Sequence, residues 1–374
     1  MKRIGKRLIM VINSDRFFLS HRKDIALAAR NEGWNVSVIT CDTGLGDELR
    51  ALGLDYRPLP MRVSRIGLKG DLKTLRMLER IYREEPDAVI HHVGMKLIMI
   101  GGVAAHRAGA RRVVNAVCGL GSAFSRKGAA RSVALVLLRR VLDGFDGVTI
   151  FQNHDDERLL AEAGVPLGRR VYLKGSGIDL ERCPLCRFPE GRPMHVIFTG
   201  RMLREKGVED FCTAAEMLRG EMEGRVVFDL YGGLSDNRGG LTTGDLDRIT
   251  DGRYIRWHGY CDDIPRRLAE SVVMVFPSYY REGLPKSLIE ASAVGRAIIT
   301  TDSVGCRDTV EDGVNGHLVA PHAPEQIAAR LREMLADMDA CREMGMKSRE
   351  MAERDYDIRD IVAAHLRIYG MLAE

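Results

Sequence analysis

Short runs rich in β-branched and aromatic residues alternate with amphipathic helical runs along almost the whole chain. This alternation is typical of βαβ units, in which helices cover both faces of a parallel sheet. The pattern occurs as two series, the first within residues 8–173 and the second within residues 195–319. The sequence therefore predicts an α/β protein with two Rossmann-like, doubly wound parallel-sheet domains facing a cleft.

The chain length supports two domains, since 374 residues exceed what one ordinary core holds. We expect an N-terminal domain over 1–175, a linker rich in Gly, Pro and charge over 176–193, and a C-terminal domain over 194–357. A last helix, 358–374, is expected to be able to cross back to the first domain. Two open parallel sheets bind ligands at the carboxyl ends of their strands, but this architecture alone does not decide a function.

Charge is divided unevenly between the two halves. Residues 1–175 carry 30 Lys+Arg against 18 Asp+Glu, and residues 176–374 carry 26 against 34. A basic first half suits an anionic partner such as a membrane surface or a phosphorylated substrate, although mutual attraction of two domains explains the same split. Nucleic acid is not expected, because few aromatic residues interleave the basic ones.

No apolar stretch is long enough to cross a bilayer, since 97–105 and 133–138 fall below the ~18 residues required. The basic start resembles the first part of a signal peptide, but the apolar run that follows, 8–12, is too short. We therefore expect a cytoplasmic protein, peripheral on the cytoplasmic face of the inner membrane. Eight mostly isolated cysteines fit a reducing compartment, and Cys183 with Cys186 forms only half of a zinc site, so no metal is expected.

The most informative stretch is Phe276-Pro-Ser-Tyr-Tyr-Arg-Glu-Gly-Leu-Pro-Lys-Ser-Leu-Ile-Glu-Ala291. A buried strand is expected to end at Phe276, and a helix is expected to begin with Pro285 in its first turn. Free N–H groups at a helix start bind phosphate, and Gly283 permits close approach of a ligand to the backbone. Glu282 in the loop and Glu290 in the helix can then face one extended ligand. Two solvated carboxylates are the alternative.

A second loop follows the first strand of the second series, in Phe198-Thr-Gly-Arg-Met-Leu-Arg-Glu-Lys-Gly207. Gly200 and Gly207 bracket a tight turn before a helix, and Arg201 and Lys206 can reach anionic oxygens. Basic residues at a helix start are slightly unfavourable without a ligand, which favours a functional role over surface charge.

With these two loops the sequence resembles glycosyltransferase family 4, whose fold is named GT-B and whose signature is a Glu-x7-Glu motif. The resemblance implies that Glu282 contacts donor-sugar hydroxyls, that Glu290 binds the ribose, and that Arg201 and Lys206 hold the diphosphate. It also implies retention of configuration and a donor site without metal or other cofactor. The donor-binding residues it implies besides Glu290 are Gly283, Leu284, Pro285, Lys286, Ser287, Gly200 and His258.

The first domain departs from the family, because Arg16 and Phe17 stand where many members have a Gly-Gly pair. Its loops resemble a narrower branch of bacterial enzymes that extend undecaprenyl-diphosphate-linked glycans, capsule or O-antigen. A structural role explains these loops equally well. Basic residues around 133–138 would in addition attach the domain to anionic lipid, although a buried helix with charged ends is the alternative. The acceptor-binding residues that the branch implies are Ser14, Phe18, His21, His92, Lys96, Asn115, Gly121 and Arg126.

The sequence thus predicts a hexosyltransferase that uses a nucleotide diphosphate sugar, UDP-linked by preference, and a polyprenyl-diphosphate-linked or other glycan acceptor. Bacterial surface polysaccharide or glycoprotein synthesis is the expected setting. Two alternatives stay open: a non-hydrolysing nucleotide-sugar epimerase, and a non-catalytic subunit that binds a nucleotide sugar. Conversion of the free nucleotide sugar would identify the epimerase, whereas transfer or hydrolysis would exclude the non-catalytic subunit.

Overall fold

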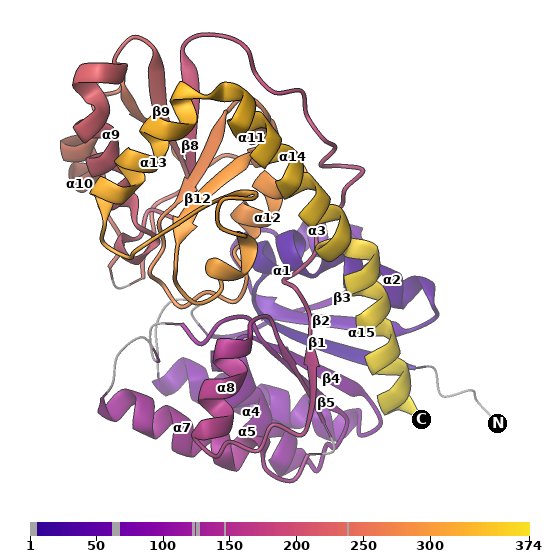
Figure 1. The fold of residues 1–374 in the computed structure, drawn as a ribbon. Helices are drawn as coiled ribbons and strands as arrows, with labels where there is room; N and C mark the ends of the chain where they lie inside the picture. The colour runs from indigo at the N-terminus through magenta and orange to yellow at the C-terminus, as the bar shows by residue number, and fades with distance from the viewer. Residues whose placement is uncertain (1–5, 62–67, 122–123, 125–127, 146, 238) are drawn as a thin grey trace. The chain divides into compact units, whose positions relative to one another are not determined.

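The computed structural model describes residues 6–61, 68–121, 124, 128–145, 147–237 and 239–374. The chain divides into two compact units. The first comprises residues 1–177 together with 358–374, and the second comprises residues 178–357 (Figure 1). Each unit contains one parallel sheet with helices on both faces, as the alternating pattern predicts. None of the helices in the described ranges combines the length and apolar character that a bilayer-spanning helix needs.

The described part of the first unit contains seven parallel strands in the order β3-β2-β1-β4-β5-β6-β7. The strands are β1 (Arg7–Ser14), β2 (Asn35–Cys41), β3 (Asp55–Pro58), β4 (Val89–Val93), β5 (Val113–Val117), β6 (Val148–Phe151) and β7 (Arg169–Tyr172). The helices are α1 (Asp15–His21), α2 (Lys23–Asn31), α3 (Gly46–Ala51), α4 (Leu68–Glu84), α5 (Met95–Ala108), α7 (Ala129–Leu142), α8 (His154–Glu162) and α15 (Ile358–Ala373).

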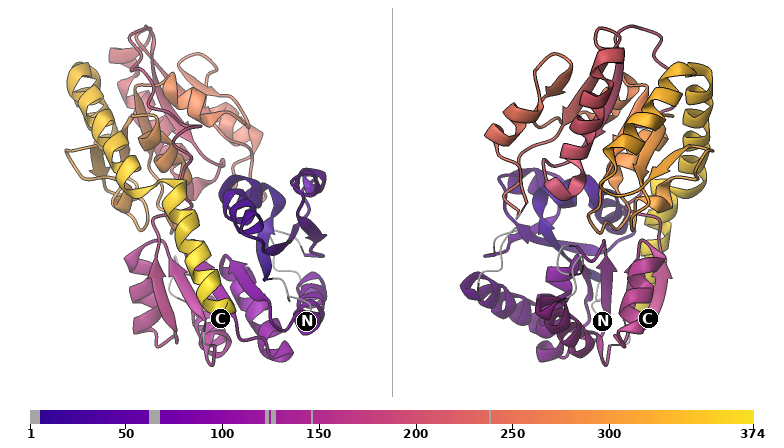
Figure 2. Two further views of the ribbon diagram at one scale, coloured as in Figure 1. Left: turned by 90° about the vertical axis from the view of Figure 1, so that its right-hand side faces the viewer. Right: turned by 60° about the vertical axis from the view of Figure 1, so that its left-hand side comes forward.

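The central strand β1 explains why this sheet is covered on both sides. Leu8, Met10 and Ile12 belong to a core shared with α2 and α15, whereas Ile9 and Val11 belong to a core shared with α4 and α5. Successive side chains of a strand point to opposite faces, so a continuous apolar run needs two layers of helices. The C-terminal helix α15 supplies part of one layer and lies against α2 and β4 (Figures 1 and 2).

The described part of the second unit contains six parallel strands in the order β10-β9-β8-β11-β12-β13. The strands are β8 (Met194–Thr199), β9 (Val226–Tyr231), β10 (Ile255–Trp257), β11 (Val273–Phe276), β12 (Ala297–Thr301) and β13 (Gly316–Val319). The α-helices are α9 (Val208–Met222), α10 (Thr243–Ile249), α11 (Ile264–Ala269), α12 (Lys286–Ala293), α13 (Pro324–Ala336) and α14 (Met338–Asp355). Two short 3-10 turns, η1 (Arg204–Lys206) and η2 (Arg307–Thr309), lie in its loops.

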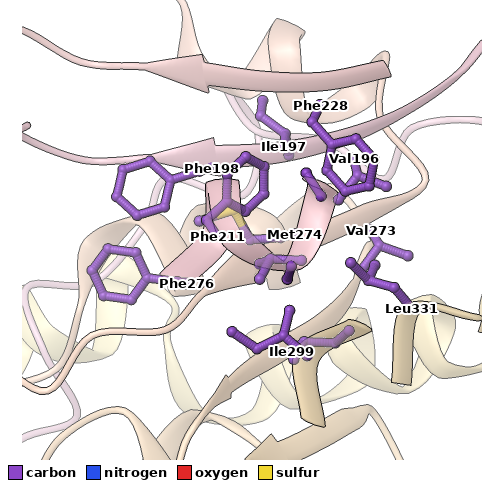
Figure 3. Close-up of a cluster of buried hydrophobic side chains, with 14 of the residues drawn as sticks. Val196, Ile197, Phe198, Phe211, Phe228, Val273, Met274, Phe276, Ile299 and Leu331 are labelled. Carbon is purple, nitrogen blue, oxygen red and sulfur yellow. The ribbon is translucent and has the colours of Figure 1, made fainter. Parts of the chain in front are cut away.

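Aromatic side chains pack at the centre of the second unit, next to the ends of β8 and β11. The rings of Phe198 and Phe276 stack with their centroids 5.7 Å apart, and Phe198 also contacts Phe211 of α9 (Figure 3). Neighbouring strands β8 and β11 therefore end over one shared layer of rings. The sheet reverses its winding direction between these two strands, and such a switch point is where loops diverge to form a ligand site.

Residues 178–193 belong to the second unit, whereas the sequence pattern predicts a linker over 176–193. Ile178 and Cys183 are buried in a cluster with Leu284 and Ile289. The segment is also held by the guanidinium of Arg296, which is 1% exposed and donates to the carbonyls of Cys186 (3.2 Å) and Arg187 (2.9 Å).

The same guanidinium donates to four more backbone carbonyls. These carbonyls belong to Leu268 (3.1 Å), Ala269 (2.8 Å), Val294 (3.0 Å) and Gly295 (3.0 Å). Burial lowers the pKa of Arg296 to about 10, so the group remains charged at neutral pH. One cation thus joins the segment before β8 to the ends of α11 and α12.

We expect Arg296→Met to lower the free energy of unfolding of the second unit by about 3 kcal/mol or more, because the carbonyls that Arg296 satisfies would lose their partner inside the core. Arg266→Met is the matched control, since that side chain is 67% exposed and surface changes cost roughly 0.5 kcal/mol or less. Urea denaturation followed by tryptophan fluorescence measures both. An equal effect of the two substitutions would contradict the role given to Arg296.

Candidate functional site

The loop after β8 and the loop after β11 are in direct backbone contact. The carbonyl of Glu205 accepts hydrogen bonds from the backbone N–H groups of Tyr279 (3.0 Å) and Tyr280 (2.9 Å). Gly207 makes the contact possible, because a Cβ at this position would lie 2.2 Å from the carbonyl oxygen of Pro277. Its φ of 77° also lies in the left-handed region that favours glycine. The two loops at the switch point are therefore fixed to each other.

An ion pair lies where these loops meet. The Nζ of Lys206 contacts Oε1 of Glu282, and the two side chains are only 12% and 11% exposed. Ser278 Oγ donates to the same carboxylate oxygen at 3.0 Å. The ammonium also lies over the rings of Phe276 and Tyr280, 5.2 Å and 5.5 Å from their centroids. Three side chains, those of Phe276, Ser278 and Tyr280, thus surround one cation and one carboxylate.

Such a pair is a costly element for stability alone. Taking two charges out of water is repaid only by excellent geometry, and an apolar pair of similar size is often at least as stable. Preorganised charges of this kind instead suit a ligand that carries both an anionic group and hydroxyl groups. Lys206 offers a cation for the first, and Glu282 offers an acceptor for the second.

A third loop, after β12, packs against the loop that carries Glu282. The hydroxyls of Thr301 and Ser303 both donate to the carbonyl of Ser278, the second at 2.7 Å. Gly305 allows close packing, because a Cβ there would lie 2.4 Å from the carbonyl oxygen of Gly283. These residues therefore hold the backbone on which Glu282 sits.

The second glutamate of the motif lies one turn into α12. Glu290 faces Lys286, whose Nζ is 3.6 Å from its carboxylate, and burial raises the pKa of Glu290. The helix begins at Lys286 with Pro285 as its N-cap, one residue later than predicted. Leu284 is buried in the cluster that also holds Ile178 and Cys183, so the start of this helix is anchored by the segment before β8.

The remaining donor residues predicted from the sequence differ in their surroundings. Arg201 is exposed, and its side chain makes no hydrogen bond or ion pair with the described residues. Gly200 lies against Gly232, since a Cβ on the latter would be 1.7 Å from the carbonyl of Gly200. Ser287 is half-buried at the start of α12. The ring of His258 contacts Asp229 at 2.6 Å and is therefore engaged on β9.

In the first unit, backbone N–H groups at the start of α1 and in the loop after β2 are satisfied by the chain's own side chains. Ser14 is the N-cap of α1 and accepts from the N–H of Phe17 at 3.1 Å. The buried carboxylate of Asp15 accepts from the N–H groups of Arg16 (2.7 Å), Thr43 (2.7 Å) and Leu45 (3.1 Å). Although burial opposes it, these hydrogen bonds and the one from the Thr43 hydroxyl hold the pKa of Asp15 below its usual value. A tethered carboxylate thus occupies a set of N–H groups suited to an anion.

Besides Ser14, three of the predicted acceptor residues are buried. Phe18 is fully buried in the core beside β1. His92 lies between Tyr82 and Asn115, with ring nitrogens 3.0 Å from the Tyr82 hydroxyl and 3.0 Å from the Asn115 amide oxygen. Because His92 is 0% and Asn115 3% exposed, neither offers its side chain to a ligand in this structure. They form a satisfied polar network inside the sheet layer.

The structure also describes three other predicted acceptor residues, His21, Lys96 and Gly121. The ring of His21 stacks on Phe17 with centroids 4.0 Å apart. Lys96 pairs with Asp71 at 2.9 Å at the start of α5. Gly121 is half-buried, with φ of 67°, and Arg126 lies outside the described residues.

Two comparisons of sequence cover both units. Residues 21–174 match the family described as "Glycosyl transferase 4-like domain", and residues 193–337 match "Glycosyl transferases group 1". The chain is 26% identical to the N,N'-diacetylbacillosaminyl-diphospho-undecaprenol alpha-1,3-N-acetylgalactosaminyltransferase of Campylobacter jejuni, over 94% of this chain and 97% of that protein. It is 28% identical to the GDP-mannose-dependent alpha-(1-6)-phosphatidylinositol monomannoside mannosyltransferase of Mycobacterium tuberculosis, over 81% of this chain and 80% of that one.

The fold has solved counterparts as well. The crystal structure of Anabaena HepE in complex with UDP superposes with a TM-score of 0.76 at 16% identity, covering 98% of this chain and 100% of that chain. At this identity the likeness concerns the fold alone.

We expect Gly207→Ala to lower the free energy of unfolding by about 2 kcal/mol or more and to weaken binding of a nucleotide, since the added methyl would separate the two loops. Gly220→Ala on α9 is the matched control, because a Cβ there meets nothing within 4 Å and should stabilise the helix by about 0.5–1 kcal/mol. Thermal unfolding with and without UDP measures both. The contact would be irrelevant to the site if Gly207→Ala left UDP binding unchanged.

Proposed function

Because the chain belongs to the GT-B glycosyltransferases, we propose that it transfers a hexose or N-acetylhexosamine, with retention of configuration, from a nucleotide diphosphate sugar to a polyprenyl-diphosphate-linked or other glycan acceptor. The observation that carries the proposal is the half-buried pair of Lys206 and Glu282 at the switch point of the second sheet. Bacterial surface polysaccharide or glycoprotein synthesis is the proposed setting.

In this proposal the cationic groups of the β8 loop bind the departing diphosphate. Lys206 is the preorganised point charge, and exposed Arg201 adds a planar guanidinium that can contact two phosphate oxygens at once. The carbon–oxygen bond to the leaving phosphate breaks as the acceptor oxygen bonds to the same face of that carbon. The departing phosphate oxygen takes the acceptor proton, so no carboxylate nucleophile is required. The charge of the leaving group is met by protein cations rather than by a metal.

The two glutamates have different proposed roles. Glu282 accepts hydrogen bonds from hydroxyls of the donor sugar, and its position is set by Lys206 and Ser278. Glu290, half-buried beside Lys286, accepts from the ribose hydroxyls. It has a smaller effect on turnover than Glu282. A contact to remote parts of the donor adds mainly to binding, whereas a contact at the leaving group acts on the rate.

The nucleobase and the acceptor are the finer parts of the proposal. The relative from Campylobacter is named for an undecaprenol-linked acceptor and the structural counterpart was solved with UDP, which supports UDP and a lipid-linked glycan. The mycobacterial relative is named for GDP-mannose, so a panel of UDP, GDP and dTDP sugars in a thermal-shift screen is the direct test. A ligand at ~100 times its Kd adds roughly 2.7 kcal/mol of stability.

The expected effect of Lys206→Ala is a turnover number lower by about 10²–10³-fold, with a smaller change in donor affinity, because the charge of the leaving group loses its preorganised partner. Release of UDP from a UDP-N-acetylhexosamine in the presence of a polyprenyl-diphosphate-linked sugar measures turnover, and calorimetry measures affinity. Lys347→Ala, which alters an exposed pair with Glu350, is the control. An unchanged turnover number would remove Lys206 from the mechanism, and formation of a free epimeric sugar nucleotide would replace the proposed reaction.

We also propose that the first unit attaches to an anionic membrane through α7. Val133, Val136 and Leu137 are 67%, 49% and 37% exposed, and their spacing puts them on one face of the helix. Exposed Arg140 continues that face, four residues after Val136. A helix with an apolar stripe and basic flanks lies in the interface plane of a bilayer and binds anionic lipid.

Replacing Val136 and Leu137 together by Asp should reduce co-sedimentation with vesicles containing phosphatidylglycerol by about tenfold or more, because two apolar side chains no longer enter the interface. Val314→Asp changes an equally accessible apolar residue of the second unit and should have no effect. Vesicles of phosphatidylcholine alone should bind the unaltered protein more weakly. Equal sedimentation of the double variant and the control would exclude α7 as the attachment surface.

A further inference from the structure

A hollow of about 730 Å³ lies on the second unit and involves neither the β8 loop from Gly200 to Gly207 nor the Glu282 loop among its described lining residues. Its floor is formed by side chains of β8, β9 and β10 and of the residues just after β10. Its rim is formed by the segment before β8 and by α11. We call it the β9–β10 hollow. Its lining includes Arg192, His195, Asp229, Arg256, His258 and Tyr260.

The hollow exists because one face of the sheet is polar at this edge. Phe228 of β9 contacts Phe211 of α9, so Asp229, the next residue, points to the opposite face. On that opposite face α11, α12 and α14 pack against β8, β11, β12 and β13. The outer strands there present polar side chains where a parallel sheet normally carries apolar residues under a helix.

Asp229 is the centre of this polar face. Its carboxylate is 3% exposed and contacts His195 Nδ1 (2.6 Å), His258 Nε2 (2.6 Å) and both Nε and Nη2 of Arg256 (2.8 and 3.0 Å). Burial would raise the pKa of Asp229, but the hydrogen bonds from the two histidines and the charge of Arg256 hold it below its usual value. The carboxylate is therefore ionised and fully satisfied, and it fixes the orientation of three side chains.

The atoms left facing the hollow suit a ligand that carries both an anionic group and hydroxyl groups. Since an ionised carboxylate only accepts, His195 Nδ1 and His258 Nε2 carry the hydrogens, and the other ring nitrogens are the outward ones. The outward nitrogen of each ring can then accept a hydrogen bond from a hydroxyl group. Arg256 Nη1 and exposed Arg192 add donors, and none of these four groups is paired outward with a described residue.

The acidic group of the rim is already engaged. Glu270 pairs with Arg266 at 3.2 Å and with Arg267 at 2.9 Å. The cationic groups of the hollow, rather than the carboxylate of Glu270, are thus available to a ligand.

An aromatic surface stands next to these donors. The ring of Tyr231 is contacted by His258, with centroids 4.5 Å apart, and by the guanidinium of Arg267, 5.8 Å from its centroid, so the accessible ring is that of Tyr260 on the rim, which is 58% exposed. A sugar ring has apolar C–H faces and a polar edge, so it fits a site that combines aromatic faces with a few placed hydrogen-bonding groups. The volume also falls in the range of small-molecule sites.

We propose that the β9–β10 hollow binds a uronic acid residue of an acidic glycan, as a site separate from the Lys206–Glu282 pair of the same unit. The carboxylate of the sugar meets Arg192 and Arg256, its hydroxyls meet His195 and His258, and its ring lies on Tyr260. The ligand class rests on the proposed function, which makes a glycan the expected partner. A transferase with this site holds an acidic polysaccharide on its second unit while the donor site exchanges nucleotides.

The test is calorimetric titration of the whole protein with three probes. These are a tetrasaccharide of alternating glucuronate and N-acetylglucosamine, the neutral tetrasaccharide of N-acetylglucosamine, and inorganic phosphate. The variants are Arg192→Ala with His195→Ala, and separately Tyr260→Ala, which changes an exposed ring and leaves the Asp229 network intact. Arg253→Ala, an exposed arginine just before β10 and outside the hollow, is the matched control.

We expect the acidic tetrasaccharide to bind at least tenfold more tightly than the neutral one, and its affinity to fall at least tenfold in both test variants but not in Arg253→Ala. Equal binding of the acidic and neutral probes, equal binding by all variants, or phosphate binding as tightly as the tetrasaccharide would each overturn the proposal. UDP is titrated into every variant as well. If the unaltered protein does not bind UDP, the proposed function is contradicted, whereas the result on glycan binding in the hollow is unaffected.

Discussion

The candidate site of the second unit depends on one backbone contact, that between Gly207 and the carbonyl of Pro277. Strands β8 and β11 are neighbours whose following segments turn to opposite faces of the sheet, so nothing in their pairing forces their loops to meet. The absence of a side chain at Gly207 lets them touch, and Glu205 then accepts two N–H groups from the other loop. Only in that register do Lys206 and Glu282, 76 residues apart in sequence, form a pair.

The alternating pattern predicts both sheets because parallel strands buried on two faces leave an unmistakable apolar run. It also places Arg201, Lys206, Glu282 and Glu290 correctly on the loops after β8 and β11 and on α12. What it misses depends on contacts between distant segments: one case is the pair of hydroxyls, from Thr301 and Ser303, that donate to the carbonyl of Ser278. Another is the segment before β8, whose composition resembles a linker although Arg296, far along the chain, binds its carbonyls.

The first unit shows the limit of reading polar residues as ligands. His92 and Asn115 have the composition of a binding loop, yet they satisfy each other inside the sheet layer. The sequence does not distinguish a buried polar side chain that has a hydrogen-bond partner from an exposed polar side chain, because the two occur in the same local pattern. In the second unit β9 and β10 each carry one charged residue between apolar neighbours, Asp229 and Arg256, and the two are paired in register on the sheet.

Asp15 has a consequence for how the first unit meets phosphate. Its carboxylate lies at the start of α1 and accepts from Arg16 beside it and from Thr43 and Leu45 in the loop after β2, so it acts as an intramolecular competitor for these N–H groups. An anion that binds there therefore has to displace a carboxylate that belongs to the same chain.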